Sequence, residues 1–337
     1  MTHNRKTRKA RSRRQALAGA LATLGAVTLA GLPAAVQAQT FPDKPMRIVV
    51  PFGAGGAVDI IARAIGQELA KRLGQPVVVE NRTGASGNIA AEHVIKSAPD
   101  GYTLLMASPG NAVNATLFSK LPFNPATDYT QVALIAGVPT AMLAGPATPG
   151  NNFKEFLAAA KAKPGSLNFG SGGAGTTEHL SAEMLKAAAG LQMTHIPYKG
   201  GAAAMNDLMG GQINLMFSNL SQSLPFIRSG KMRVFGVAST ERHPALPDVP
   251  TFVELGYPDF KVSVWWGLMG PAKMNPEIVN KINATVNEAM AGPDMKARLE
   301  TMNATPMNGS PKAFADFFQR EIVSWGKVVK ASGAKAD

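Results

Sequence analysis

Apolar residues follow two different rhythms along the first third of the chain. Short runs rich in Val, Ile and Leu predict buried strands, whereas Ile61, Ile65 and Leu69 recur every fourth position, as on one face of a helix. Strands and helices that alternate in this way favour a parallel sheet with right-handed crossovers. In chain order, the elements predicted here are a strand at residues 46–51, a helix at 57–73, a strand at 77–80, a helix at 88–97 and a strand at 103–107.

The same alternation starts again in the middle of the chain, after an apolar run at residues 133–138. Its predicted elements are strands at residues 142–144, 167–169, 193–197, 213–217 and 234–238 and helices at 153–163 and 177–189. Residues 276–332 are predicted to be helical, with Pro276 and Pro311 in first turns. Two strand–helix sets predict two lobes, with candidate crossings between them at residues 139–150 and 262–270.

The N-terminal residues have the layout of an export signal. Residues 5–14 hold seven Lys or Arg and no acid, an uncharged stretch covers residues 16–32, and small residues precede a cleavage site after Ala38. The apolar core of roughly 16 residues is shorter than the ~20 that span a bilayer, so we expect cleavage near Ala38 rather than a permanent anchor. Residues 12–17 half-match a twin-arginine signal, so the export route stays open. The expected location is the bacterial periplasm.

Composition narrows the possible functions further. Removal of the seven basic residues of the signal lowers the formal net charge from +12 to +5, and the remaining Lys and Arg are scattered. Nucleic-acid binding, which usually needs a concentrated basic stripe, is therefore not expected. The chain has no cysteine, which excludes a thiol nucleophile and a cysteine metal site. A chain of this length buries enough surface to fold without disulfides.

Three glycine-rich loops lie where a predicted strand ends and a predicted helix begins. They are residues 51–59, 81–88 and 170–177. Glycine lets the backbone approach a ligand closely, and a helix N-terminus offers unpaired N–H groups with partial positive charge. Ligands of open α/β sheets bind outside the carboxyl ends of the strands, where these loops lie. The three loops together predict a cleft that binds an anion.

Catalytic constellations are missing from the sequence. Gly170, Gly172 and Gly175 match a dinucleotide-binding fingerprint, but the strand that should end in an acidic residue ends instead in residues 197–200 (PYKG). No nucleophile-elbow motif occurs, and the five histidines show no metal-ligand spacing. We therefore expect no metal and no cofactor, and an exported NAD-dependent oxidoreductase stays a minor alternative.

Several single residues allow both a structural and a functional interpretation. Asp59 either caps its helix or meets a polar group of a ligand. His179 and His195 are expected to be packed, hydrogen-bonded residues rather than general bases. Phe52 and Tyr198 either flank a ligand or cover a loop. The tryptophans at 265 and 266 are assigned to packing in a crossing segment rather than to ligand stacking.

The order of several short motifs resembles the Bug family, the periplasmic receptors of tripartite tricarboxylate transporters. The resemblance runs over the mature chain from Phe41 onward. Each motif alone is only moderately specific for this family, whereas their order and spacing together are strong evidence for the resemblance. The motifs are residues 41–45 (FPDKP), 48–52 (IVVPF), 55–59 (GGAVD), 80–85 (ENRTGA), 99–104 (PDGYTL), 173–176 (GAGT), 179–180 (HL) and 197–200 (PYKG).

The resemblance implies an α/β, two-lobed periplasmic-binding-protein-like (type II) fold, with two crossing segments and the ligand cleft between the lobes. Residues 39–140 with 264–337 would form lobe 1, and residues 141–263 lobe 2. It also implies a small carboxylate ligand held by backbone N–H groups, hydroxyls and water. The implied contacts are Phe52, Gly53, Gly55, Gly56, Asp59, Ser86, Gly87, Ser108 and Asn111 in lobe 1, and Gly173, Gly175, Thr176, Thr177, Tyr198, Lys199 and Gly200 in lobe 2.

The expected function is therefore that of a solute-binding receptor, not an enzyme. It would capture an organic acid and deliver it, as a monomer, to the permease subunits of a tripartite tricarboxylate transporter. The alternative is a protein that signals its ligand to a membrane sensor kinase. The identity of the acid does not follow from the sequence.

Overall fold

The computed structural model describes residues 41–336, so the expected signal peptide and its cleavage site at Ala38 lie outside the described residues. Most predicted elements are confirmed within a few residues, and the helix at 57–73 is confirmed at both ends. The elements of the first strand–helix set are β1 (Met46–Val50), α2 (Ala57–Leu73), β2 (Val77–Asn81), the short 3₁₀ turn η1 (Ala85–Gly87), α3 (Asn88–Ile95), β3 (Thr103–Ala107) and α4 (Pro109–Leu117).

The second set follows the long strand β4 (Tyr129–Ala144). Its elements are α5 (Phe153–Ala162), β5 (Leu167–Ser171), α6 (Thr177–Ala189), β6 (Met193–Pro197), α7 (Gly201–Met209), β7 (Leu215–Asn219), α8 (Leu220–Arg228) and β8 (Arg233–Val237). The chain then continues through β9 (Ser263–Pro271), α9 (Pro276–Ala291), α10 (Pro293–Thr301), β10 (Thr305–Pro306) and α11 (Pro311–Ser332). Pro276 and Pro311 occupy first turns, as predicted.

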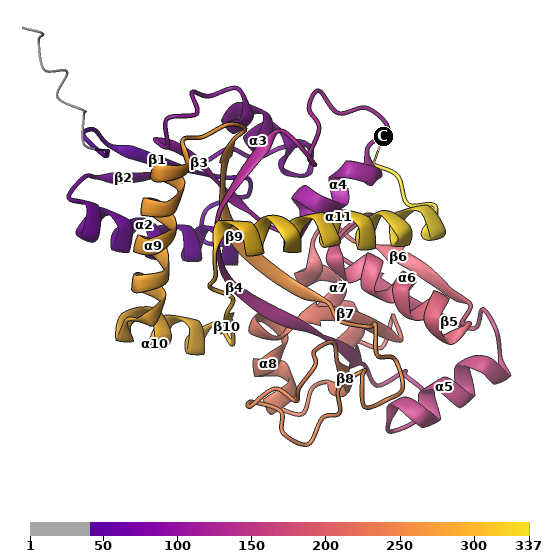
Figure 1. The fold of residues 1–337 in the computed structure, drawn as a ribbon. Helices are drawn as coiled ribbons and strands as arrows, with labels where there is room; N and C mark the ends of the chain where they lie inside the picture. Colours follow the sequence, from indigo (N-terminus) through magenta and orange to yellow (C-terminus); the bar gives the residue numbers. More distant parts are fainter. Residues whose placement is uncertain (1–40, 337) are drawn as a thin grey trace, which may run out of the picture. The chain divides into compact units, whose positions relative to one another are not determined.

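The strands follow the order β2-β1-β3-β9-β4-β7-β5-β6, with β8 and β10 also paired to β4. The predicted parallel pairing is confirmed within each set, where β1 pairs with β2 and β3, and β5 pairs with β6 and β7. The long strands β4 and β9, which run side by side between the two sets in Figure 1, are antiparallel to their neighbours. The sheet is therefore mixed, and an α/β fold with two parallel regions is formed around this antiparallel pair.

The predicted start of the second set needs a correction. Residues 139–150 were expected to be a crossing that contains a short strand, but residues 129–144 form one continuous strand. Pro139 is the last residue of β4 that pairs with β9, and Thr140 is the first that pairs with β7. Because proline has no N–H to donate, it is tolerated at the point where a strand changes partners.

Helices α4, α7 and α8 were not predicted. Helix α8 contains Pro225, which removes one backbone donor and hides the helical pattern. Helix α7 begins directly at Gly201 after a glycine N-cap, and its first turn is rich in alanine. Helix α7 packs against β5 and β7, and helix α8 packs against β4 and β7, so tertiary packing supplies much of the stability of both.

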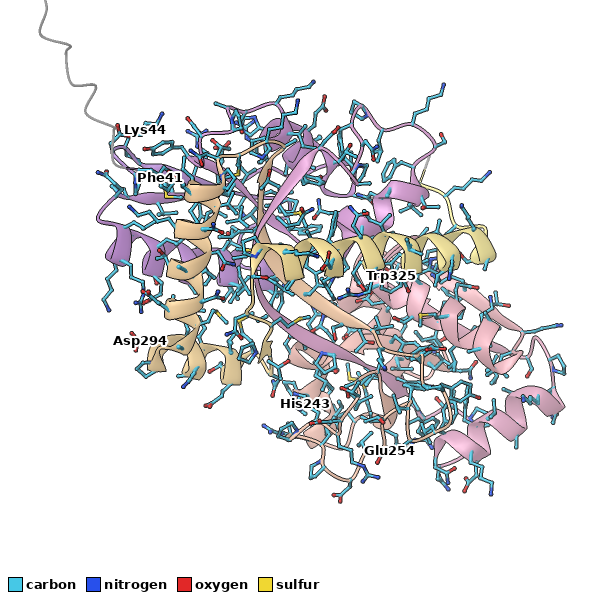
Figure 2. The ribbon with its side chains drawn as sticks, in the orientation of Figure 1. Phe41, Lys44, His243, Glu254, Asp294 and Trp325 are labelled. Carbon is cyan, nitrogen blue, oxygen red and sulfur yellow. The ribbon has the colours of Figure 1, made fainter. Side chains whose placement is uncertain are left out.

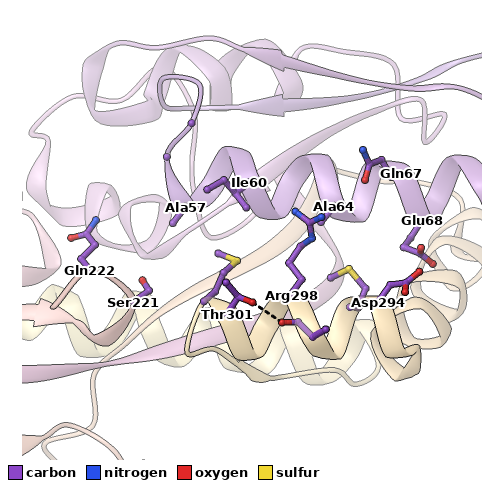
Figure 3. A pocket seen from close by; sticks show the side chains of 15 residues that line it. Ala57, Ile60, Ala64, Gln67, Glu68, Ser221, Gln222, Asp294, Arg298 and Thr301 are labelled. Carbon is purple, nitrogen blue, oxygen red and sulfur yellow. Dashed lines mark hydrogen bonds between the residues drawn. The ribbon is translucent and has the colours of Figure 1, made fainter. Parts of the chain in front are cut away.

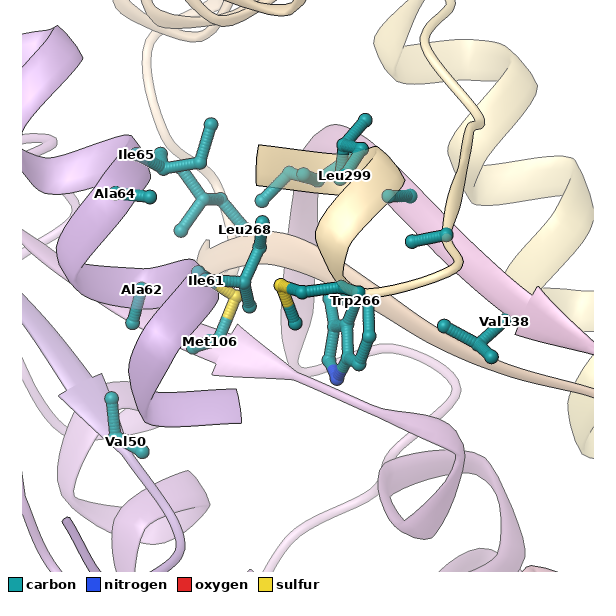
Figure 4. Close-up of a cluster of buried hydrophobic side chains, with 14 of the residues drawn as sticks. Val50, Ile61, Ala62, Ala64, Ile65, Met106, Val138, Trp266, Leu268 and Leu299 are labelled. Carbon is teal, nitrogen blue, oxygen red and sulfur yellow. The ribbon is translucent and has the colours of Figure 1, made fainter. Parts of the chain in front are cut away.

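The core consists of two clusters of buried side chains on the two faces of the sheet. One cluster joins Ile61 of α2, Met106 of β3 and Trp266 of β9, as Figure 4 shows. Trp265 faces the other cluster and donates its indole N–H to Glu321 of α11 at 2.8 Å. Both tryptophans are fully buried, which agrees with packing in a crossing strand. Within residues 41–336, none of the helices combines the length and the apolarity that a membrane span requires.

Candidate functional site

Among residues 41–336, six helices follow the carboxyl end of a parallel strand, directly or through a short loop. Three of these junctions belong to the first set and three to the second, and their N-cap residues are Gly56, Gly87, Ser108, Thr176, Gly200 and Asn219. The predicted contact residues include one or more at each of the first five junctions. The sixth, at Asn219, was missed, although a polar residue after the predicted strand at 213–217 was a usable signal.

The first glycine loop, residues 51–59, is exposed but firmly anchored. Asp59 is only 3% exposed, and its carboxylate accepts hydrogen bonds from Gly55 N, from Asn81 Nδ2 and from two nitrogens of Arg63, all at 2.9 Å. Asn81 also donates to Phe52 O. The hydrogen bond from Arg63 is the main reason why the pKa of Asp59 falls to about 2. The carboxylate is therefore charged and directed at protein groups.

The other junctions of the first set combine exposed and buried residues. Ser86 is exposed with a left-handed backbone, and its carbonyl accepts a hydrogen bond from Asn114 Nδ2 at 3.0 Å. Gly87 is buried against Pro51. Ser108 and Asn111 are also buried and form a reciprocal cap at the start of α4.

The third glycine loop, residues 170–177, is held by side chains of its own neighbourhood. Thr176 Oγ1 donates to Gly173 O at 2.8 Å and accepts from His179 N at 3.3 Å, which makes it the N-cap of α6. Gly175 N donates to His179 Nδ1 at 3.1 Å. The predicted contacts Gly173, Gly175, Thr176 and Thr177 are all partly exposed.

Residues 198–200 lie beside this third loop. Tyr198 N donates to Ser171 O at 3.0 Å, and Gly200 N donates to Gly172 O at 3.2 Å. The Tyr198 hydroxyl donates to Asp207 at 2.7 Å, and burial together with this hydrogen bond raises the pKa of Tyr198 to about 12. Lys199 and Gly200 are exposed.

The two sets meet where the third loop contacts α4. A Cβ built on Gly175 would lie only 2.3 Å from Leu117 Cδ2, so glycine is needed there for the close approach. Gly175 also has a φ of +77°, which favours glycine on backbone grounds. The structure thus brings the predicted lobe 2 loop against α4, the helix that Ser108 caps and that contains Asn111.

A cavity of about 940 Å³ opens beside the first loop and reaches across to the second set. In Figure 3, α2 lines one side and α10 the other, with Ser221 and Gln222 of α8 at one end. Of the predicted contacts, Gly55 and Gly56 line it and the other fourteen do not. Its lining residues are Gly55, Gly56, Ala57, Ile60, Ala64, Gln67, Glu68, Ser221, Gln222, Asp294, Met295, Ala297, Arg298, Thr301 and Met302.

The lining of this cavity combines apolar side chains with the charged side chains of Glu68, Asp294 and Arg298. The exposed Ile60 and the buried Met295 and Met302 give it apolar walls. Arg298 extends from α10 toward α2 in Figure 3, and no carboxylate of residues 41–336 forms an ion pair with it. Among the same residues, no cluster of histidine and carboxylate side chains could hold a metal ion.

The dinucleotide alternative gains nothing from the geometry of the third loop. Gly172 N donates to the carboxylate of Glu178 at 2.5 Å. The loop amide that would have to face a pyrophosphate is therefore already occupied by a side chain of the protein itself.

Comparisons with known proteins identify the family. Residues 61–334 match the model of the tripartite tricarboxylate transporter family receptor. Protein BugT of Bordetella pertussis is 36% identical over 318 residues, which cover 94% of this chain and 98% of BugT. A protein from the tcbD-tcbE intergenic region of Pseudomonas sp. is 35% identical over 321 residues, which cover 94% of both chains.

Solved structures agree with these sequence relatives. The periplasmic binding protein BugD has a TM-score of 0.74 at 33% identity, covering 88% of this chain and 100% of BugD. An R. palustris protein solved with adipate has a TM-score of 0.76 at 34% identity, covering 88% and 99%. MatC from Rhodopseudomonas palustris, solved with malate, has a TM-score of 0.73 at 36% identity, covering 86% and 100%. The resemblance to the Bug family and the two-lobed fold are therefore confirmed, and this chain belongs to the tripartite tricarboxylate transporter receptor family.

Proposed function

We propose that the protein is a periplasmic receptor that captures a small dicarboxylate between its two strand–helix sets and delivers it to a tripartite tricarboxylate permease. The cavity at Gly55 and Gly56 carries this proposal, because it faces Ser221 and Gln222 from the opposite set. A ligand there would touch the N-termini of α2 and α8 together. Adipate and malate in the related structures support a dicarboxylate.

Backbone donors can supply the affinity that such a receptor needs. Helix N-termini present N–H groups without intrahelical partners, and their dipoles favour an anion. Four or five charge-assisted hydrogen bonds of roughly 1.5–3 kcal/mol each, less the costs of ordering, leave about 8 kcal/mol, which corresponds to a micromolar complex. The ligand carboxylate that faces these helix N-termini therefore needs no arginine partner.

The remaining polar groups have separate roles in this proposal. Asp59 holds the first loop in shape and does not face the ligand, because its oxygens already accept four hydrogen bonds. Tyr198 donates its hydroxyl to Asp207 and does not line this cavity, so the proposal assigns it no contact with the ligand there. Arg298, at the side of the cavity away from the glycine loop, is the group we assign to the second carboxylate.

The strands β4 and β9 are the elements about which the two lobes would close. In the proposed division, lobe 1 contains residues 39–140 and 264–337, and lobe 2 contains residues 141–263. A ligand that contacts both lobes stabilises the closed form, which the permease would then recognise. We propose that the protein does this as a monomer in the periplasm, after removal of residues 1–38.

The test is binding of purified residues 39–337 to adipate, malate and a wider panel of organic acids. We expect a rise in melting temperature with at least one dicarboxylate and a Kd near the micromolar range by calorimetry. Gln222→Glu places a negative charge at the α8 N-terminus and is expected to weaken that binding about tenfold or more. Gln192→Glu, an equally exposed glutamine just before β6, is the matched control.

Two results would contradict the proposal. One is a complete panel without any shift in melting temperature. The other is equal dicarboxylate affinity in Gln222→Glu and Gln192→Glu, which would place the ligand elsewhere. Delivery is tested separately, by comparing uptake of the labelled acid in cells with and without the receptor gene.

A further inference from the structure

Two histidine rings are stacked directly behind the third glycine loop. His179 of α6 and His195 of β6 have ring centroids 3.9 Å apart and planes inclined by 17°. Phe169 of β5 continues the stack, 4.9 Å from His195. His179 is only 6% exposed, and the pair lies between the first turn of α6 and the parallel strands β5 and β6.

Both rings form hydrogen bonds that reach the loop. Gly175 N donates to His179 Nδ1 at 3.1 Å. His195 Nε2 lies 2.7 Å from Ser171 Oγ, which in turn accepts from Gly173 N at 3.1 Å. The stack therefore fixes the loop at two points, one directly and one through a serine hydroxyl.

The bond from Gly175 requires that His179 carry no proton on Nδ1. In a neutral ring with its proton on Nε2, Nδ1 accepts the amide hydrogen. In the protonated ring both nitrogens are donors, so Nδ1–H would face Gly175 N–H and the bond would be lost. Two stacked imidazolium rings would also repel each other.

The charged groups around the pair come from several elements. Glu183 Oε1 lies 3.8 Å from His179 Nε2 and is itself paired with Lys186 at 2.7 Å. Lys327 of α11 lines the same surface cavity as Glu183 and Lys186, and Glu178 faces the loop amide of Gly172. Burial is the largest effect and lowers the pKa of both histidines to about 4, while Lys186 adds to it and Glu183 opposes it at His195.

We propose that His179 and His195 are positioning residues, which act as an uncharged imidazole pair that fixes the backbone of the third glycine loop from behind, at Gly175 directly and at Gly173 through Ser171. This inference rests on the proposed receptor function for its purpose, but its geometry is present without a ligand. The depressed folded pKa means that the pair contributes fully above the unfolded value of about 6.5 and that its contribution is lost as pH falls through about 4. Acidification thus loosens this loop.

The experiment uses residues 39–337 without any added acid. Amide hydrogen exchange gives the protection factor of Gly175, and ¹⁵N NMR of histidine gives the tautomer and the titration of each ring. His179→Phe keeps the stacked ring but removes the acceptor, and it is expected to lower the Gly175 protection factor about tenfold at pH 7. His179→Asn places an amide oxygen near the Nδ1 position and is expected to restore protection and abolish its loss at low pH.

His243→Asn is the matched control, because Nδ1 of His243, which is labelled in Figure 2, also accepts a backbone N–H, from Ala245, outside the glycine loops. This substitution is expected to leave the amide protection factor of Gly175 unchanged. The proposal is overturned if His179 carries its proton on Nδ1, if it titrates near 6.5, or if His179→Phe leaves Gly175 protection intact. Calorimetry with the dicarboxylates tests the receptor function independently, so a non-binding protein with a normal histidine result would disprove only that function.

Discussion

The glycine loop after β1 and the glycine loop after β5 perform the same turn from a strand into a helix, but different chemistry holds them. The first loop is anchored by the charged carboxylate of Asp59, with Arg63 and Asn81 as partners. The loop after β5 is anchored by the His179–His195 stack and by Ser171. One anchor works while it is ionised, and the other works while it is neutral.

The N-caps of α2 and α6, the helices that follow these two loops, also differ. Gly56 at the start of α2 provides no side-chain cap, so its helix presents bare amides to the cavity. At the start of α6, the hydroxyl of Thr176 accepts a hydrogen bond from His179 N and donates one to Gly173 O. The comparison teaches that similar turns can differ in the backbone donors they keep open, because the N–H groups of Gly173, Gly175 and Thr176 in the loop after β5 already donate within the protein.

The largest expected effect comes from removing the ionic anchor. Asp59→Ala leaves Gly55 N and Asn81 Nδ2 without their acceptor, and we expect a loss of about 2–3 kcal/mol in the free energy of unfolding. Chemical denaturation measures it. Asp316→Ala, which breaks an exposed pair with Lys312, is the control and should change stability little. Equal effects of the two substitutions would mean that Asp59 is not an anchor.

A somewhat smaller loss in the free energy of unfolding is expected where the third glycine loop meets α4. Gly175→Ala introduces a Cβ that clashes with Leu117 on a left-handed backbone, and it should cost about 2 kcal/mol. Gly190→Ala has a similar φ of +65° but no atom within 4 Å, so it should cost only about 1 kcal/mol. Because Leu117 is buried, Leu117→Ala destabilises the protein by itself, but Gly175→Ala should cost less in the Leu117→Ala background than in the native chain. Identical costs at Gly175 and Gly190 would disprove the close contact.

The pH dependence should separate the two anchors. The pKa of Asp59 is lowered from 3.8 to about 2, so its contribution is present above 3.8 and is lost as pH falls through 2. The histidine contribution is lost earlier, between about 6.5 and 4. The free energy of unfolding should therefore fall across this window, whereas the amide protection of Gly175 should fall only as pH approaches about 4, while Gly55 stays protected. Simultaneous loss at both glycines would show global unfolding instead.

The smallest effects concern the caps. Gly56→Ser adds a hydroxyl to an extended residue with room for it, and it should stabilise the protein by a few tenths of a kcal/mol. Thr176→Gly should destabilise it by a similar amount. Thermal unfolding of both variants tests these signs. A stabilising Thr176→Gly would mean that this threonine is strained.

Much of the fold could be predicted because local pattern and local structure agree. The helix at 57–73 was predicted at both ends, since its apolar spacing is regular and Gly56 and Gly74 flank it. The glycine junctions were predictable for the same reason. The continuity of β4 through Pro139 was not, because a strand that changes partners is defined by residues far away in sequence.

The sequence by itself determined the alternation of strands and helices, the glycine loops at the helix N-termini and the family. Only the tertiary structure decided which surfaces face each other: Gly55 and Gly56 opposite Ser221 and Gln222, Arg298 beside the same cavity, and Gly175 against Leu117. It also decided that Asp59 and the two histidines support the loops from behind. Helical and strand periodicity depend on neighbours a few positions apart, whereas a binding site depends on distances between elements that the chain order does not encode.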